Sequence, residues 1–229
     1  WVGGCGRAEG MFIKQCRAVA AALCVAGRAT PSGEGQRFAH HVLTSRGDPE
    51  ITLRIDTAFR ALPPMDVPIG GLTVARRFVF VDAGADRVVR RMTVVQFERV
   101  NAGNAFRFVY PSRPPRQFGA QMYRFGTYVY DDARAADAAP DREAGRTRAL
   151  LQAQGLHAPR LWRTARLARV SDAAGMSEII IFYCENADAD YPASGPWPGA
   201  DEDGDAPLEG AARDALAARM EAAVRATRG

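Results

Sequence analysis

The amino-acid sequence predicts an α+β fold: a twisted antiparallel sheet of about seven strands, with an inserted helix and a C-terminal amphipathic helix packed on it. Three observations support this prediction. Apolar and polar residues alternate through the middle of the chain, several connections are short and rich in turn residues, and two segments have helical features. An open sheet and a sheet that curls toward a barrel both fit the pattern. The length of 229 residues suits a single domain over residues 30–229.

The alternating segments are rich in β-branched and aromatic residues, as half-buried strands usually are. The predicted strands are residues 51–59, 72–81, 87–100, 105–110, 117–131, 160–170 and 178–183. Turn residues at 82–86, 101–104 and 171–177 join neighbouring strands, and such short links impose antiparallel pairing. Two proline-containing links, 62–71 and 111–116, interrupt the series because proline cannot donate a hydrogen bond within a central strand.

Two segments are predicted to be helical. The first runs from about Pro140 to Gln154, with proline in its first turn and Gly155 as a stop. The second begins near Pro207 and carries an apolar stripe that is expected to pack on the sheet. The stripe consists of Leu208, Ala212, Leu216, Met220 and Ala223 or Val224.

The segment from Met11 to Ala29 has the order of a secretory signal peptide: a short basic start, an apolar stretch and small residues. We therefore expect a periplasmic or secreted protein, and we interpret residues 1–10 as sequence upstream of the start. The alternative for 11–29 is a buried N-terminal helix. No apolar run reaches the about 18 to 20 residues that a transmembrane helix needs.

The charge distribution argues against nucleic acid as a partner. The formal net charge is +4, but residues 1–29 hold four basic side chains against one acidic side chain, so only +1 remains on the rest of the chain. A protein that binds phosphate backbones is expected to keep a positive surplus on its folded body.

Arginines on otherwise apolar strand patterns give the candidate ligand site. Guanidinium groups on a concave sheet face suit carboxylate or phosphate ligands, and the tyrosines around Arg124 can stack on a ring. Alternation in the hairpin around 82–86 predicts Arg76 and Arg90 on one face, with Arg77 and Arg91 on the other. Arginines on both faces also fit an ordinary exposed surface. The candidate ligand-binding residues are Arg76, Arg90, Arg124, Tyr128 and Arg163.

Local catalytic signatures are missing from the sequence, which has no G-x-S-x-G, H-E-x-x-H, phosphate-loop or C-x-x-C motif. This favours an exported, non-catalytic module that binds a small ligand or a protein partner and has no expected cofactor. One alternative is an envelope enzyme whose site is assembled from scattered acidic and arginine residues. The other is a structural envelope protein with a weak calcium-binding loop.

The candidate metal site lies in an acidic stretch near the C-terminal end. Residues 201–212, DEDGDAPLEGAA, resemble the calcium loop of the EF-hand family. That resemblance implies Asp201, Asp203 and Asp205 as the first three ligands.

Two departures from the EF-hand pattern weaken this site. Ala206 stands where the loop has glycine, and Ala212 stands where a bidentate glutamate closes the cage. Asp188 or Asp190, which follow the last predicted strand, could substitute for the missing ligand. We prefer the other interpretation, a solvated turn in which Asp205 caps the final helix.

Overall fold

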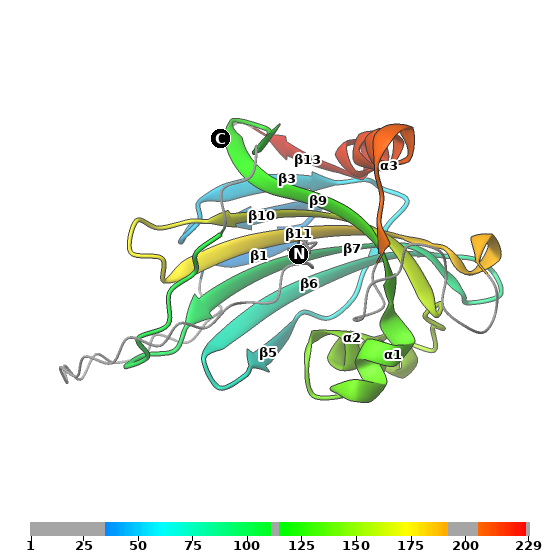
Figure 1. Ribbon diagram of the computed structural model, residues 1–229, viewed down its shortest axis with the longest axis horizontal. Coiled ribbons are helices and arrows are strands. Elements are labelled where there is room, and N and C mark those ends of the chain that lie inside the picture. Colours follow the sequence, from blue (N-terminus) through cyan, green and yellow to red (C-terminus); the bar gives the residue numbers. More distant parts are fainter. Residues whose placement is uncertain (1–34, 111–114, 192–205, 228–229) are drawn as a thin grey trace, which may run out of the picture.

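The computed structural model describes residues 35–110, 115–191 and 206–227, and within them two antiparallel sheets and three α-helices form an α+β fold (Figure 1). The larger sheet has nine strands in the order β12-β9-β10-β11-β7-β6-β4, while β5 pairs with β6 and β8 with β9. Its strands are β4 (Arg60–Ala61), β5 (Met65–Ile69), β6 (Thr73–Ala83), β7 (Val89–Val100), β8 (Arg116–Phe118), β9 (Gln121–Asp131), β10 (Leu161–Val170), β11 (Ser177–Asn186) and β12 (Ala206–Pro207).

The five long strands β6, β7, β9, β10 and β11 coincide with predicted segments, and two of the predicted turns join them as hairpins. Residues 82–86 include the last two residues of β6 and the start of the β6–β7 connection, and 171–177 run from the end of β10 to the first residue of β11. β5 lies within the link that proline was expected to keep out of the sheet. Because β5 pairs only with β6 at the edge, Pro68 costs the sheet no central hydrogen bond.

The predicted strand at 105–110 is wrong. This segment forms no ladder; instead the Phe108 N–H donates to the carbonyl oxygen of Gly175 at 2.8 Å, so the segment contacts the β10–β11 turn. Alternation is nevertheless present, since Phe108 is buried and its neighbours Arg107 and Val109 are exposed. Alternating burial indicates an extended segment that is covered on one side. It does not show that the segment is hydrogen-bonded to a neighbouring strand.

Of the two forms of sheet that fit the sequence, the structure has the open one, and the barrel-like alternative is wrong because the sheets do not close. β12 and β9 stand at one end of the strand order, and β6 with β4 stands at the other. A second sheet, in the order β1-β2-β3-β13, supplies the cover that closure would have given. It consists of β1 (Gln36–Ala39), β2 (Val42–Ser45), β3 (Ile51–Ile55) and β13 (Val224–Thr227).

The main hydrophobic core lies between the two sheets and α3 (Gly210–Ala223). Leu53 of β3, Phe80 of β6, Ile181 of β11 and Leu216 of α3 are buried in it. The expected stripe of the last helix is therefore present at its C-terminal half, whereas Ala212 is exposed. The helix begins at Gly210 because Ala206 and Pro207 are extended and pair with β9.

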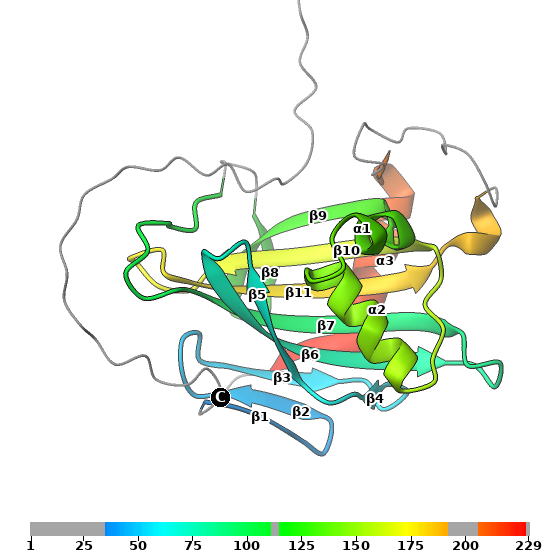
Figure 2. The same cartoon turned by 90° about the horizontal axis from the view of Figure 1, so that it is seen from below.

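The other face of the large sheet is covered by α1 (Asp132–Ala138) and α2 (Glu143–Ala153). Figure 2 shows these two helices in front of the sheet and α3 behind it. Leu151 of α2 packs in a second core with Val94, Trp162 and Cys184. Within the described residues, no helix is long and apolar enough to cross a membrane.

Candidate functional site

The large sheet opens where β9 and β10 stop pairing. Their register runs from Leu161 opposite Asp131 to Ala168 opposite Arg124, and it ends there. Both strands continue past this point, β9 back to Gln121 and β10 on to Val170. At its far end β10 still pairs with β11, and β9 pairs with β8. The two strands therefore take different partners beyond the last shared pair.

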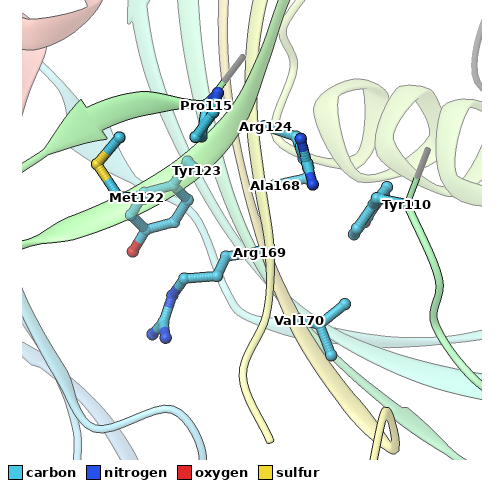
Figure 3. Close-up of a pocket in the computed structure, with 8 residues that line it drawn as sticks. All are labelled: Tyr110, Pro115, Met122, Tyr123, Arg124, Ala168, Arg169 and Val170. Carbon is cyan, nitrogen blue, oxygen red and sulfur yellow. The ribbon is translucent and has the colours of Figure 1, made fainter. Parts of the chain in front are cut away.

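A pocket of about 310 Å³ lies at this separation (Figure 3). Its lining residues are Tyr110, Pro115, Met122, Tyr123, Arg124, Ala168, Arg169 and Val170. Figure 3 shows Tyr123 and Arg169 on one side of the strand pair, and Arg124 and Tyr110 on the other. The lining thus combines aliphatic side chains with two arginines and two tyrosines, a mixture that suits a partly apolar ligand.

Tyr123 and Arg169 form the most buried polar part of this lining. Tyr123 is 1% exposed, and its hydroxyl has no hydrogen-bond partner of standard geometry within the described residues, although the Arg169 guanidinium lies close enough to interact with it. Burial raises the pKa of the Tyr123 hydroxyl, and the positive charge of Arg169 opposes the rise. The guanidinium carbon of Arg169 lies 5.5 Å from the Tyr123 ring centroid, a cation–π distance. The Arg169 Nε is buried and also lacks a hydrogen-bond acceptor there.

Tyr110, on the opposite side, is held by a buried polar cluster. Its hydroxyl donates to the carboxylate of Glu178, and Nη2 of Arg166 donates to the Tyr110 hydroxyl at 3.4 Å. Burial raises the pKa of Tyr110 above its ordinary value, so this group remains a neutral donor at physiological pH. The coil segment 105–110 is thereby fixed against the sheet, and it delivers Tyr110 to the pocket wall.

Two glutamates lie directly opposite one another beneath Tyr110. Glu178 of β11 is paired in register with Glu98 of β7, and both are almost fully buried. Like charges in this position destabilise a sheet unless their oxygens are satisfied. Thr73 Oγ1 donates to Glu98 at 2.5 Å, and Gln96 Nε2 donates to it at 2.8 Å. These bonds stabilise Glu98, which lies opposite the glutamate that accepts from Tyr110.

A second buried charge lies under α2, away from the pocket. Asp132, the first residue of α1, accepts a hydrogen bond from Arg148 Nε at 2.7 Å. Burial raises the pKa of Asp132 to about 6, and Arg148 opposes the rise. Arg77 is also buried nearby, where desolvation lowers its pKa and Glu143 opposes that effect. This cluster joins the two helices to the sheet.

Of the five residues predicted to bind a ligand, Arg124 lines the pocket. Tyr128 instead packs edge-on against Tyr130, with ring centroids 6.4 Å apart. Arg163 pairs with Asp190 at 2.5 Å. The structure thus does not gather the predicted arginines on one surface.

The remaining two predicted arginines are separated by a β-bulge. Arg76 lies opposite Phe97, so it shares a face with Arg91 and not with Arg90 as predicted. The register shifts between Asp82 and Ala83, where Arg90 is the extra residue in β7 and interrupts the alternation. Arg76 pairs with Asp66 at 3.0 Å.

The five predicted ligand residues did not include Tyr110, Tyr123 or Arg169, although Tyr123 is one of the tyrosines around Arg124 that were expected to be able to stack on a ring. Tyr123 and Arg169 belong to alternating strands and look like ordinary strand residues in the sequence. They differ from other strand residues because they lie where the pairing of β9 with β10 ends. Beyond that point β9 pairs with β8 and β10 pairs with β11. The tyrosine-rich strand around Arg124 was the one sequence signal that pointed to this part of the sheet.

The candidate metal ligands Asp201, Asp203 and Asp205 lie outside the described residues. Asp188 accepts hydrogen bonds from the backbone N–H groups of Arg160 at 3.0 Å and Leu161 at 2.8 Å. In the part of the chain that the structure describes, no group of three or more His, Cys, Asp or Glu could hold a metal ion.

The proposed capping role of Asp205 does not fit the start of α3. Glu209 occupies the N-cap position, with no side-chain cap hydrogen bond. The residues between Asp205 and the helix are extended: Ala206 and Pro207 pair with β9, and the N–H of Leu208 donates to the Thr127 carbonyl at 3.0 Å. The chain therefore joins the sheet before it turns into the helix.

No protein-family model, curated protein or solved structure significantly matches this chain. The pocket between β9 and β10 is consequently the basis on which a function can be argued.

Proposed function

We propose that the protein is an exported, non-catalytic module that binds a small, partly apolar molecule in the pocket between β9 and β10. The pocket itself carries this proposal. Its volume of about 310 Å³ falls at the lower end of the range of about 300 to 1,000 Å³ for small-molecule sites. Met122, Pro115 and Val170 supply apolar contact, while a few polar groups can fix the orientation of a ligand.

The composition of the lining favours binding over catalysis. None of the eight lining residues is Asp, Glu, His, Ser or Cys. General acid–base or nucleophilic chemistry most often uses such a group within hydrogen-bond reach of the ligand, and burial raises the pKa of both tyrosines in the lining, which makes them poor bases. The enzyme alternative, which was based on scattered acidic and arginine residues, therefore receives no support from this pocket.

A pair of fluorescent dyes tests the proposal. N-phenyl-1-naphthylamine and 8-anilinonaphthalene-1-sulfonate share their ring system and differ in the sulfonate. We expect at least one of them to bind the full chain with one-to-one stoichiometry. Met122 is 49% exposed, so Met122→Trp can fill the pocket without disturbing the core, and it should weaken binding about 10-fold or more.

The matched control is Ala58→Trp, which places the same side chain at an exposed position of another connection. It should leave the dissociation constant within about 2-fold of wild type, a change of less than about 0.5 kcal/mol. Failure of both dyes to bind would refute the pocket as a small-molecule site. Equal binding in Met122→Trp and wild type would place the dye elsewhere.

Export is proposed from the order of segments between Met11 and Ala29. Expression from Met11 in a bacterial host should give a protein that has lost its leader, and intact-mass spectrometry of the periplasmic fraction would show the loss. A full-length, purely cytoplasmic product would contradict export and would leave the pocket proposal unaffected.

A further inference from the structure

We propose that the ligand of the pocket between β9 and β10 is an amphipathic organic anion, whose charged group is held by the Arg169 guanidinium and the Tyr123 hydroxyl. This inference rests on the proposed binding function and specifies the chemical class of the ligand. Its evidence is independent of the pocket volume, because it comes from the hydrogen-bonding state of two side chains.

Arg169 carries a permanent positive charge that is not neutralised by an ion pair within the described residues. Its strand neighbours Arg163 and Arg166, in contrast, are engaged by Asp190 and by Tyr110. The face of the Tyr123 ring supplies part of the stabilisation of Arg169, but a ring face does not replace an acceptor for the guanidinium N–H groups.

The Tyr123 hydroxyl interacts with the Arg169 guanidinium, which can only donate to it, so the hydroxyl proton also has no acceptor of standard geometry within the described residues. The side chain is almost completely buried, and a buried hydroxyl without a partner is costly. Figure 3 shows this hydroxyl and the Arg169 guanidinium on the same side of β10, both in the lining of the pocket. Both groups can donate a hydrogen bond, so one carboxylate or sulfonate could accept from both.

The rest of the lining determines the rest of the ligand. Besides Arg124 and Tyr110, this part of the lining consists of residues that offer only aliphatic or thioether surface: Met122, Pro115, Val170 and Ala168. A small inorganic anion would leave this surface uncovered, and a cation would be repelled by Arg169. A molecule with one anionic group and an apolar body satisfies both parts of the pocket.

The two dyes introduced above separate this inference from the proposed function. We expect the sulfonate dye to bind at least about 10-fold more tightly than its neutral analogue, because hydrogen bonds to charged groups are the strong ones. Arg169→Gln should remove this preference by weakening the sulfonate dye about 10-fold or more, while it leaves N-phenyl-1-naphthylamine within about 2-fold. Tyr123→Phe should reduce the affinity for the sulfonate dye about 3- to 10-fold.

Arg54→Gln is the charge-matched control, since Arg54 is exposed on β3 and does not line the pocket. It removes one positive charge and should change the affinity for either dye less than about 2-fold at about 0.15 M salt. Circular dichroism and thermal melts of each variant would verify folding. A second measurement needs no variant: octanoate should displace the sulfonate dye from wild type at a concentration at least about 10-fold lower than octanamide does.

The outcomes are distinct. Equal affinity of wild type for the charged and neutral dyes, or equal displacement by octanoate and octanamide, would overturn the anion and leave the binding function standing. An unchanged sulfonate-dye affinity in both Arg169→Gln and Tyr123→Phe would overturn the assignment of these residues. No binding of either dye would overturn the proposed function itself.

Discussion

The buried carboxyl of Asp132 should give the protein an unusual dependence of stability on pH. Its pKa in the folded protein is about 6, against an ordinary value of 3.8, because burial disfavours the ionised form more than Arg148 favours it. Between these two pH values the folded state holds a proton that the unfolded state has lost. The stabilisation that the Asp132 carboxyl contributes is therefore fully present below its unfolded-state pKa of 3.8. It is lost as the pH rises through the folded-state pKa of about 6.

The expected size follows from the difference of about 2.2 pH units, which corresponds to about 3 kcal/mol. The measurable quantity is the free energy of unfolding of wild type minus that of Asp132→Asn. This difference cancels the titrations that the two proteins share, as well as any constant cost of the asparagine. We expect it to fall by about 3 kcal/mol between about pH 3 and about pH 7.

Urea denaturation at a series of pH values, followed by circular dichroism, would measure this difference. Asp137→Asn is the matched control, because it makes the same substitution at an exposed position of the same helix. Its difference from wild type should change far less over the same range. A difference for Asp132→Asn that stays flat, or rises with pH, would refute the reasoning. A rise would mean that the ion pair with Arg148 outweighs the cost of burial.

Three further predictions concern other parts of the molecule. Leu216→Ala in α3 should lower the free energy of unfolding by about 2 to 5 kcal/mol in urea, because Leu216 is fully buried; a loss below about 1 kcal/mol would contradict tight packing of the helix. Burial alone would raise the pKa of Glu185, but hydrogen bonds from Arg219 and Tyr183 hold it below its ordinary value. The stabilisation is therefore present above the unfolded-state pKa and lost as the pH falls through the folded-state value, so Glu185→Gln should destabilise the protein at about pH 7 and have little effect at about pH 3 in urea denaturation; equal losses would exclude an ionic origin. Thermal melts with calcium and with chelator should differ by less than about 4 °C; a larger shift that disappears in Asp203→Ala would establish a calcium site.

The long strands could be predicted because each buries at least one face along most of its length. Residues 72–81 and 178–183 are rich in apolar side chains. Each of these segments also pairs with a strand from which only a short turn separates it in the sequence. The short strands β1 and β2 could not be predicted in this way, because four residues contain too few alternations to stand out. The segment 105–110 shows the converse error, in which a one-sided pattern belongs to a coil that contacts a turn.

The residues of the candidate site could be predicted from the sequence less well than the fold could. Arg124 was identified from its tyrosine-rich surroundings. Tyr123 and Arg169 line the pocket only because β9 and β10 stop pairing beside them. That place is fixed by what each strand pairs with next, which is a property of the whole sheet. The error about Arg76 and Arg90 has a related cause, since one extra residue in a strand reverses every face assignment beyond it.

The junction of α3 with β13 bears on the order in which the protein can fold. The helix packs on the large sheet, and the next residue, Val224, begins the strand that completes the small sheet. β13 pairs with β3, and Thr227 contacts Thr52 across 175 positions of sequence. The small sheet and the core beneath it are therefore complete only when β3 meets a strand that lies far later in the sequence. Contacts of such long range slow folding, so the small sheet is expected to form later than the hairpins of the large sheet, whose strands are neighbours in the sequence.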